Sequence, residues 1–172
     1  MRTVTIGFSK PKEFKIFAKL IMWYEESDWS HAYVKFNAVN IERHLIYQAS
    51  GRMVNFEGSI HFENHALSIH EYQIDVTDEQ YKSVMQFCVD NAGVKYGILS
   101  ALGAGLVKLG KKLNISIKNP FEDGNRSQFC SELAARVLNQ LSLINLDYDL
   151  DDITPKDLKE ALDEIPEAKK VL

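Results

Sequence analysis

The apolar residues of this chain alternate with polar ones in some segments and recur at helical spacing in others. Residues 3–8 alternate weakly and predict an opening strand, and residues 9–24 then predict a helix. Residues 31–37 and 43–50 alternate more clearly and flank a turn near Val39-Asn40. Two such segments in succession are typical of a β-hairpin.

Two more strands are predicted beyond this hairpin. Gly51 allows a tight turn into a third strand over residues 52–56. A polar loop that contains histidines separates this strand from a fourth, over residues 67–76. Because the connections are short, we expect the sheet to be mainly antiparallel.

Helix starts dominate the second half of the chain. Thr77 and Gln80 form a capping box for a predicted helix over residues 77–91, which places Cys88 in the core. Ser127 is a good N-cap for a second helix, and Thr154 precedes a proline in the first position of a third.

Alternation in the hairpin sorts its residues onto two faces. A turn centred between Val39 and Asn40 pairs His31 with Gln48 and places both on one face. A register slip of one residue would move Gln48 to the other face. The face of His31 also carries Tyr33, Lys35, His44 and Ile46, and the opposite face carries Ala32, Val34, Phe36, Arg43, Leu45 and Tyr47.

Composition narrows the class of protein. With 172 residues, 45% of them hydrophobic and 26% charged, the chain has the balance of one globular domain over residues 1–172. The formal charge of -4 supplies no basic stripe for phosphates, so we expect no nucleic-acid partner and no tight binding to anionic lipid heads. Two cysteines, Cys88 and Cys130, are too few for a disulfide framework, and a reducing compartment is expected.

The sequence predicts neither export nor a membrane span. The N-terminus has the pattern of a strand and no cleavage site follows it, so we expect a protein that is cytoplasmic as synthesised. The longest apolar stretch, residues 97–109, is too short to cross a bilayer and is interrupted by glycines. Residues 97–113 could form an amphipathic helix against lipid or an acyl chain, although such a stripe is more often core packing.

Cys130 is the first candidate for chemistry. It lies in the first turn of the helix that Ser127 begins, where unpaired N–H groups and the helix dipole favour a thiolate over a thiol. The alternative is a small buried hydrophobe, which is what most free cysteines are. A histidine and a polar partner on neighbouring strands favour the nucleophile.

His31 is the candidate general base. It opens a strand directly after Trp29-Ser30, at an edge of the sheet where an imidazole could face a helix end. Its predicted neighbour Gln48 can accept one ring N–H and leave the other nitrogen facing the thiol. A histidine or a glutamine at a strand end can equally be structural, and an amide adds no charge to stabilise an imidazolium.

Four motifs follow one another along the chain: Ser30-His31-Ala32-Tyr33-Val34, Tyr47-Gln48-Ala49 with Gly51 after it, Tyr96-Gly97, and Phe129-Cys130-Ser131-Glu132-Leu133. This order resembles the permuted branch of the NlpC-type cysteine peptidases and amidases, the YiiX-like group. In that branch the His-bearing strand precedes the Cys-bearing helix, an architecture shared with lecithin-retinol acyltransferase-like proteins. The resemblance extends to residues 153–158.

Position by position, the resemblance implies that Cys130 is the nucleophile and His31 the base. Gln48 stands where the group often has glutamate, so its role as third residue is the weakest. The implied fold is α+β and papain-like in circularly permuted order, a small antiparallel sheet packed by helices. The implied chemistry is acyl transfer through a thioester, with no metal and no organic cofactor.

Three aromatic residues are predicted to bind substrate. Tyr96 matches a tyrosine that recurs before the permuted cysteine, although an aromatic core residue is an equal alternative. Trp29 lies on the shoulder before His31, and Tyr33 shares the strand face of His31.

Two further clusters of possible metal ligands are not predicted to bind a metal. His61 and His65 are four residues apart and could bind a metal on a helical face, but the segment resembles a loop and a third ligand is not evident, so no metal site is predicted. The acidic residues 147–152 lack the glycine and glutamate spacing of an EF-hand.

The function favoured is a cysteine amidase or endopeptidase acting on a peptide, amide or acyl substrate, with peptidoglycan stem peptides as the class that the resemblance suggests. Lipid acyltransferase or thioesterase activity is the alternative within enzymes. A catalytically silent binding or virion-associated module is the alternative outside them. Lipid and the cell wall are the partner surfaces considered, and reaching the wall would require delivery by phage lysis, a secretion apparatus or virion entry.

Overall fold

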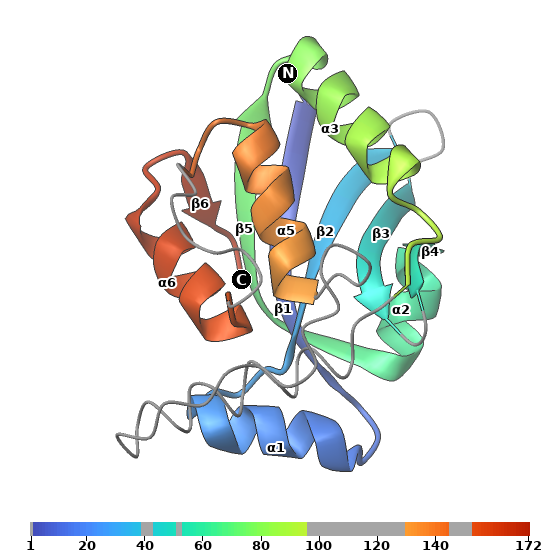
Figure 1. The fold of residues 1–172 in the computed structure, drawn as a ribbon, viewed down its shortest axis with the longest axis vertical. Helices are drawn as coiled ribbons and strands as arrows, with labels where there is room; N and C mark the ends of the chain where they lie inside the picture. The colour runs from blue at the N-terminus through green and yellow to red at the C-terminus, as the bar shows by residue number, and fades with distance from the viewer. Residues whose placement is uncertain (1, 39–42, 51–52, 96–129, 145–152) are drawn as a thin grey trace.

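The computed structural model describes residues 2–38, 43–50, 53–95, 130–144 and 153–172. Its centre is a six-stranded antiparallel sheet in the order β4-β3-β2-β1-β5-β6 (Figure 1). The strands are β1 (Arg2–Pro11), β2 (His31–Ala38), β3 (Arg43–Ser50), β4 (Met53–Gly58), β5 (Ala66–Val76) and β6 (Ala168–Lys170).

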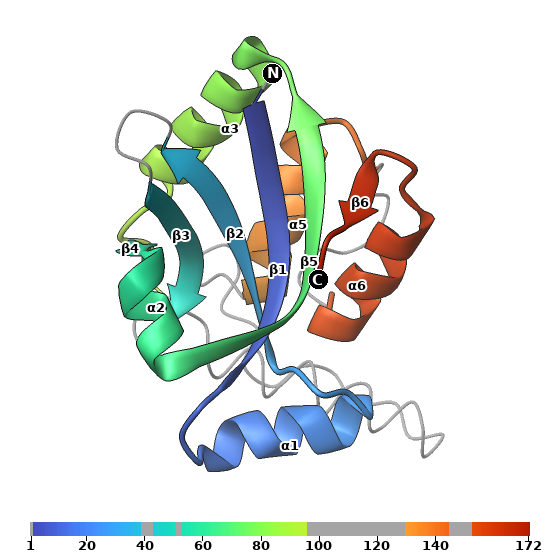
Figure 2. The ribbon, with the colours of Figure 1, turned by 180° about the vertical axis from the view of Figure 1, so that it is seen from behind.

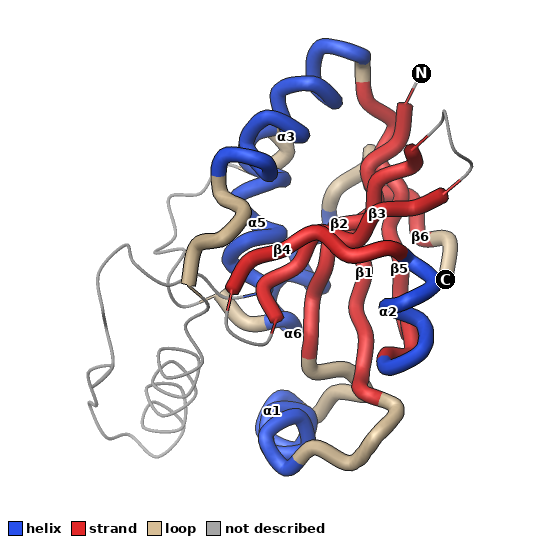
Figure 3. The backbone as a smooth tube through the Cα atoms, turned by 90° about the vertical axis from the view of Figure 1, so that its right-hand side faces the viewer, coloured by secondary structure: helices blue, strands red, loops and turns tan. Residues whose placement is uncertain are grey.

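Helices pack on both faces of the sheet, and they cover one face more fully than the other. Figure 3 shows α3 and α5 on one side and the short α2 on the other, while α1 lies beyond one end of the strands. From behind, β1, β2 and β5 stand in front of α5 (Figure 2). The helices are α1 (Ile16–Glu25), α2 (Ser59–His65), α3 (Asp78–Asp90), α5 (Cys130–Gln140) and α6 (Pro155–Glu164). The predicted α+β class, an antiparallel sheet packed by helices, is confirmed.

The main core lies between the sheet and α5. Leu133, Val137 and Leu138 of this helix are at most 1% exposed. They pack in one apolar cluster with Val34 and Phe36 of β2. Full burial of each such side chain contributes roughly 1.5–3 kcal/mol, so this face holds α5 firmly against the strands.

Period-two alternation predicted the two hairpin faces correctly but not the register. Val34 pairs with Tyr47, whereas the predicted register would pair it with Leu45. A shift of two residues preserves the faces, because side chains alternate with a period of two. Gln48 therefore stays on the face of His31, although the two residues are not directly opposite.

Local helix signals are overridden at the end of β1. Residues 9–11 were predicted to begin a helix, yet after a bulge at Phe8 and Ser9 they pair with residues 66–68 of β5. The pairing satisfies their backbone groups, and α1 starts only at Ile16. Long-range strand pairing outweighs the start signal there.

Two more elements differ from prediction. The segment with the histidines, predicted as a loop, forms α2. The short strand β6 was not predicted, because its three residues are too few to show alternation and it is defined by pairing with β5. Ser127, residues 97–113 and residues 147–152 lie outside the described residues.

The capping predictions are confirmed at two helices. Thr77 and Gln80 form both hydrogen bonds of a capping box at α3. Thr154 and Asp157 do the same at α6, with Pro155 in its first turn. Cys88 is fully buried, as predicted, and both cysteines are free.

Among the described residues, no helix combines the length and apolar character that crossing a membrane requires.

Candidate active site

Cys130 stands at the start of α5, against the first residues of β2. Its side chain is 6% exposed and belongs to the apolar core cluster. Burial raises the pKa of the Cys130 thiol, and the carboxylate of Glu25 raises it further. The backbone N–H groups of Ala32 and Ser131 act in the opposite direction, because they favour the thiolate. The thiol is therefore the resting form, with donors already placed around its sulfur.

His31 is the first residue of β2 and is partly buried. Its Nε2 atom lies 2.8 Å from Oε1 of Gln48. Burial lowers the pKa of His31, and the nearby positive charge of Lys15 lowers it too, while the contacts with Gln48 and Glu57 partly oppose the shift. A neutral imidazole follows, which is the form a general base needs.

Gln48 connects this imidazole to a carboxylate. Gln48 is 2% exposed, and its Nε2 donates a hydrogen bond to Oε2 of Glu57. A carboxylate can only accept, so the amide nitrogen must face Glu57 and the amide oxygen must face His31. The ring Nε2 of His31 then carries the proton, and Nδ1 keeps its lone pair.

The structure brings His31 and Gln48 together and places Cys130 beside the peptide that follows His31. Ala32, whose N–H approaches the sulfur, is the next residue along β2. Between the described side chains of Cys130 and His31 there is no direct hydrogen bond, and the imidazole is held on Gln48 instead. The Cys-His pair therefore stays a prediction, and it requires the imidazole to turn toward the sulfur.

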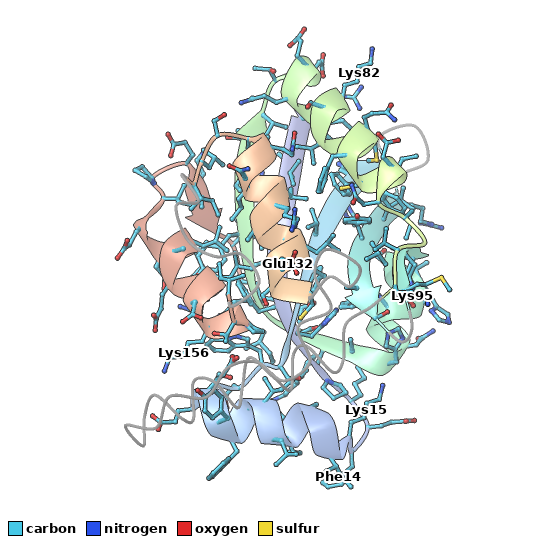
Figure 4. The ribbon with its side chains drawn as sticks, in the orientation of Figure 1. Phe14, Lys15, Lys82, Lys95, Glu132 and Lys156 are labelled. Carbon is cyan, nitrogen blue, oxygen red and sulfur yellow. The ribbon has the colours of Figure 1, made fainter. Side chains whose placement is uncertain are left out.

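A cavity of about 270 Å³ opens beside His31 and Gln48. Its walls come from the ends of the strands and from α1, with Lys15 at the start of α1 (Figure 4). Phe62 and His65 of α2 close the other side. Apolar walls with one cation and two imidazoles suit a ligand that is partly apolar and carries negative charge.

The three predicted substrate-binding aromatics have different positions. Tyr33 is 1% exposed, and its hydroxyl bonds Ser68 and Glu71 at 2.7 Å each. Trp29 is partly buried and stacks edge-on against Phe8 and His70. Neither residue lines the cavity beside His31. We therefore expect Trp29 and Tyr33 to hold the neighbouring strands of the site in place. Tyr96 lies outside the described residues.

Two carboxylates near the site were missed from sequence. Glu57 follows Asn55 on alternate positions of β4, and the pair Gln48 with Asn55 puts this row on the face of His31. The period-two pattern of residues 52–56, extended by one residue, would have indicated it. Glu25 is 7% exposed at the end of α1 and accepts from the backbone N–H of Lys156 at 3.2 Å. That contact joins distant parts of the chain, and no local pattern predicts it.

Within the described residues, Glu57, His61 and His65 come close enough together to hold a metal ion. His65 also lines the cavity of His31, so this cluster borders the candidate active site.

Comparisons with known proteins agree with the fold. No protein-family model matches the sequence, and no curated protein sequence matches it significantly. Among solved structures, the chain is similar to the metalloprotein YiiX from Escherichia coli O157:H7, with a TM-score of 0.58 and 20% sequence identity. The match covers 99% of this chain and 88% of that protein. At this identity the likeness establishes a shared fold over the whole chain, in line with the YiiX-like arrangement that the motif order predicted.

Proposed function

We propose that this protein is a cysteine hydrolase in which Cys130 is the nucleophile, His31 the general base and Gln48 the residue that orients the base. One observation carries the proposal: the row His31, Gln48 and Glu57 fixes the imidazole with a free Nδ1 lone pair. His31 is followed directly by Ala32, whose backbone N–H faces the sulfur of Cys130. A neutral imidazole held in one tautomer, one residue before the peptide that contacts the cysteine, supports this assignment.

The directions in which the pKa values of Cys130 and His31 are shifted favour a step in which the sulfur attacks the substrate while its proton moves to the imidazole. Because the pKa of Cys130 is raised and that of His31 lowered, a preformed thiolate-imidazolium pair is disfavoured. His31 Nδ1 takes the thiol proton as the sulfur bonds to the substrate carbonyl carbon, and the carbonyl electrons move onto oxygen. Backbone N–H groups at the start of α5 stabilise this oxyanion.

The second half restores the enzyme. When the oxyanion collapses, the bond to the leaving amine or alcohol breaks, and the imidazolium of His31 donates its proton to that group. A thioester remains on Cys130. Water then attacks the thioester while His31 accepts a proton, the carbon-sulfur bond breaks, and the proton returns to the sulfur as the acid leaves. These steps use only side chains and backbone of this chain.

Peptidoglycan stem peptides are the proposed substrate class. The resemblance suggests them, and such peptides carry free carboxylates. The charge of Lys15 in the wall of the cavity would favour a carboxylate near the scissile bond.

Lipid acyl transfer is the second candidate, favoured by exposed apolar residues on and before α1. On α1, Ile16, Leu20 and Trp23 recur at spacings of four and three residues and are 69%, 53% and 74% exposed, and Phe14 before the helix is 76% exposed. An apolar helix face of this kind suits contact with acyl chains.

Digestion of purified muropeptides, followed by mass analysis of the products, tests the proposal. We expect cleavage of an amide bond by the wild-type chain and none by Cys130→Ser. Short-chain thioesters and phospholipids, assayed in parallel, distinguish the second candidate. Cys88→Ala is the matched control, because Cys88 is the other buried free cysteine and has no role in the proposed reaction, so its loss should leave turnover intact. Equal activity of wild type and Cys130→Ser on every substrate would refute the nucleophile.

A further inference from the structure

Three side chains that bind transition metals meet where β4 leads into α2. The carboxylate of Glu57 and the imidazoles of His61 and His65 each offer one ligand atom, and these atoms lie within 4.8 Å of one another. From this arrangement we propose that the protein has a divalent transition-metal site, best suited to Zn²⁺, made by Glu57, His61 and His65. The proposal does not depend on the cysteine hydrolase function.

Local structure explains why the three converge. His61 and His65 are four residues apart on α2, so their side chains lie on one face of the helix. Glu57 is the next-to-last residue of β4 and faces the start of that helix. Both imidazoles approach the same carboxylate oxygen: His61 Nδ1 contacts Oε1 of Glu57, and His65 Nδ1 lies 3.7 Å from it. The missing third ligand of the sequence pattern is therefore supplied by the preceding strand.

The carboxylate is oriented by a neighbour. Gln48 donates to Oε2 of Glu57, which leaves Oε1 directed at the two histidines. Outer hydrogen bonds of this kind are typical of metal-ligating side chains, because they fix the ligand before the ion arrives. The ring of His65 is held as well, because its Nδ1–H donates to the carbonyl oxygen of His61 at 3.0 Å, which leaves Nε2 with the lone pair that can bind a metal.

The cluster opens onto a hollow that has room for further ligands. Glu57, His61 and His65 line a hollow of about 620 Å³ together with Asn55. Within the described part of the chain, the Asn55 side-chain oxygen is buried without a hydrogen-bond partner. A polar atom left unsatisfied beside three ligands is an independent sign that something polar belongs there, since such atoms are normally paired. An ion with its coordinated water would supply that partner.

The donor set selects the metal. Two imidazoles and one carboxylate match borderline ions such as Zn²⁺, which takes three protein ligands and a water in open sites. Ca²⁺ and Mg²⁺ prefer six or more oxygen ligands, and this site has too few. Zinc should therefore bind in the presence of excess magnesium.

Cys130 and His31 could also bind zinc, so the experiment separates the two places. Metal-free protein is prepared with a chelator, and Zn²⁺ is titrated against a chromophoric competitor in wild type and in Cys130→Ser. We expect one tight equivalent in both. His61→Ala and His65→Ala, each in the Cys130→Ser background, should weaken binding by at least about tenfold, which is the scale on which perturbed metal sites lose affinity.

His44→Ala is the matched control, since His44 is an exposed histidine elsewhere in the same sheet and should leave zinc affinity unchanged. A rise in melting temperature with zinc, present in Cys130→Ser and lost in His61→Ala, gives a second readout that needs no activity. His61 is largely exposed, with 78% of its side chain accessible, so its substitution should not disturb folding. Absence of zinc binding in Cys130→Ser, or binding unaffected by both histidine substitutions, would overturn the site while leaving the hydrolase proposal intact.

Discussion

The two faces of the sheet provide opposite environments for the two halves of the candidate dyad. On the α5 face, Cys130 is packed in the apolar core, and only backbone N–H groups and the buried Glu25 act on its charge. On the α2 face, His31 begins a polar row through Gln48 to Glu57. An apolar face holds a thiol neutral, and a polar row holds an imidazole in one tautomer. The difference indicates that Cys130 is activated during the reaction rather than before it.

Removing the nucleophile is expected to have the largest effect, because the proposed thioester forms on the sulfur of Cys130 and cannot form without it. Cys130→Ala should reduce kcat/KM by at least about 10⁴-fold, the scale on which loss of a nucleophile acts. Product formation from muropeptides, measured with the substrate in excess, provides the test. Activity of Cys130→Ala within tenfold of wild type would mean that Cys130 is not the nucleophile.

Removing the base tests the α2 face. His31→Ala should lower kcat/KM by about 10²–10⁴-fold, the range for general acid-base catalysis. Alkylation of Cys130 by iodoacetamide should slow as well, because the resting thiol would lose its proton acceptor. His44→Ala, on the same face but distant along the strand, serves as the control. If His31→Ala and His44→Ala behave alike, the base lies elsewhere.

Substitution of Gln48, the middle residue of the row His31, Gln48 and Glu57, should lower activity less than loss of Cys130 or His31. Gln48→Ala leaves His31 without its acceptor and should lower kcat by less than the roughly 10²–10⁴-fold expected for loss of the base itself. Gln48→Glu keeps an acceptor for the imidazole and adds the charge that an amide lacks, but it places two carboxylates together, since Glu57 is its other partner. We therefore expect Gln48→Glu to recover part of the activity only at lower pH, where one of the two is protonated. Equal rates for the two variants at every pH would argue against an orienting role.

The smallest effect concerns pH. Because the pKa of His31 is lowered, its imidazole stays neutral below the usual titration range of histidine, and activity should persist there until His31 gains a proton. The acid limb of kcat/KM against pH should thus lie below that usual range. Lys15→Gln removes one cause of the lowered pKa, so the limb should move upward. A limb at the ordinary histidine value that does not respond to Lys15→Gln would contradict the assignment.

Sequence patterns predicted most of the sheet and the members of the candidate site, but not how they connect. The alternation of residues 31–50 placed Gln48 on the face of His31 even though the register was wrong by two residues. The hydrogen bond between His31 and Gln48 was therefore predicted from the correct strand face but from the wrong strand register. In the structure it is a diagonal reach between strands and not a direct pair.

What the sequence determined by itself is local. Capping boxes at Thr77 and Thr154, the strand faces and the core position of Cys88 follow from short-range periodicity and from side chains that bond their own backbone. Tertiary structure alone decided that residues 9–11 continue β1 and that Glu57 meets Gln48, His61 and His65. Those outcomes depend on strand pairing and on the approach of β4 to α2, which join residues whose own neighbours in sequence contain no trace of the contact.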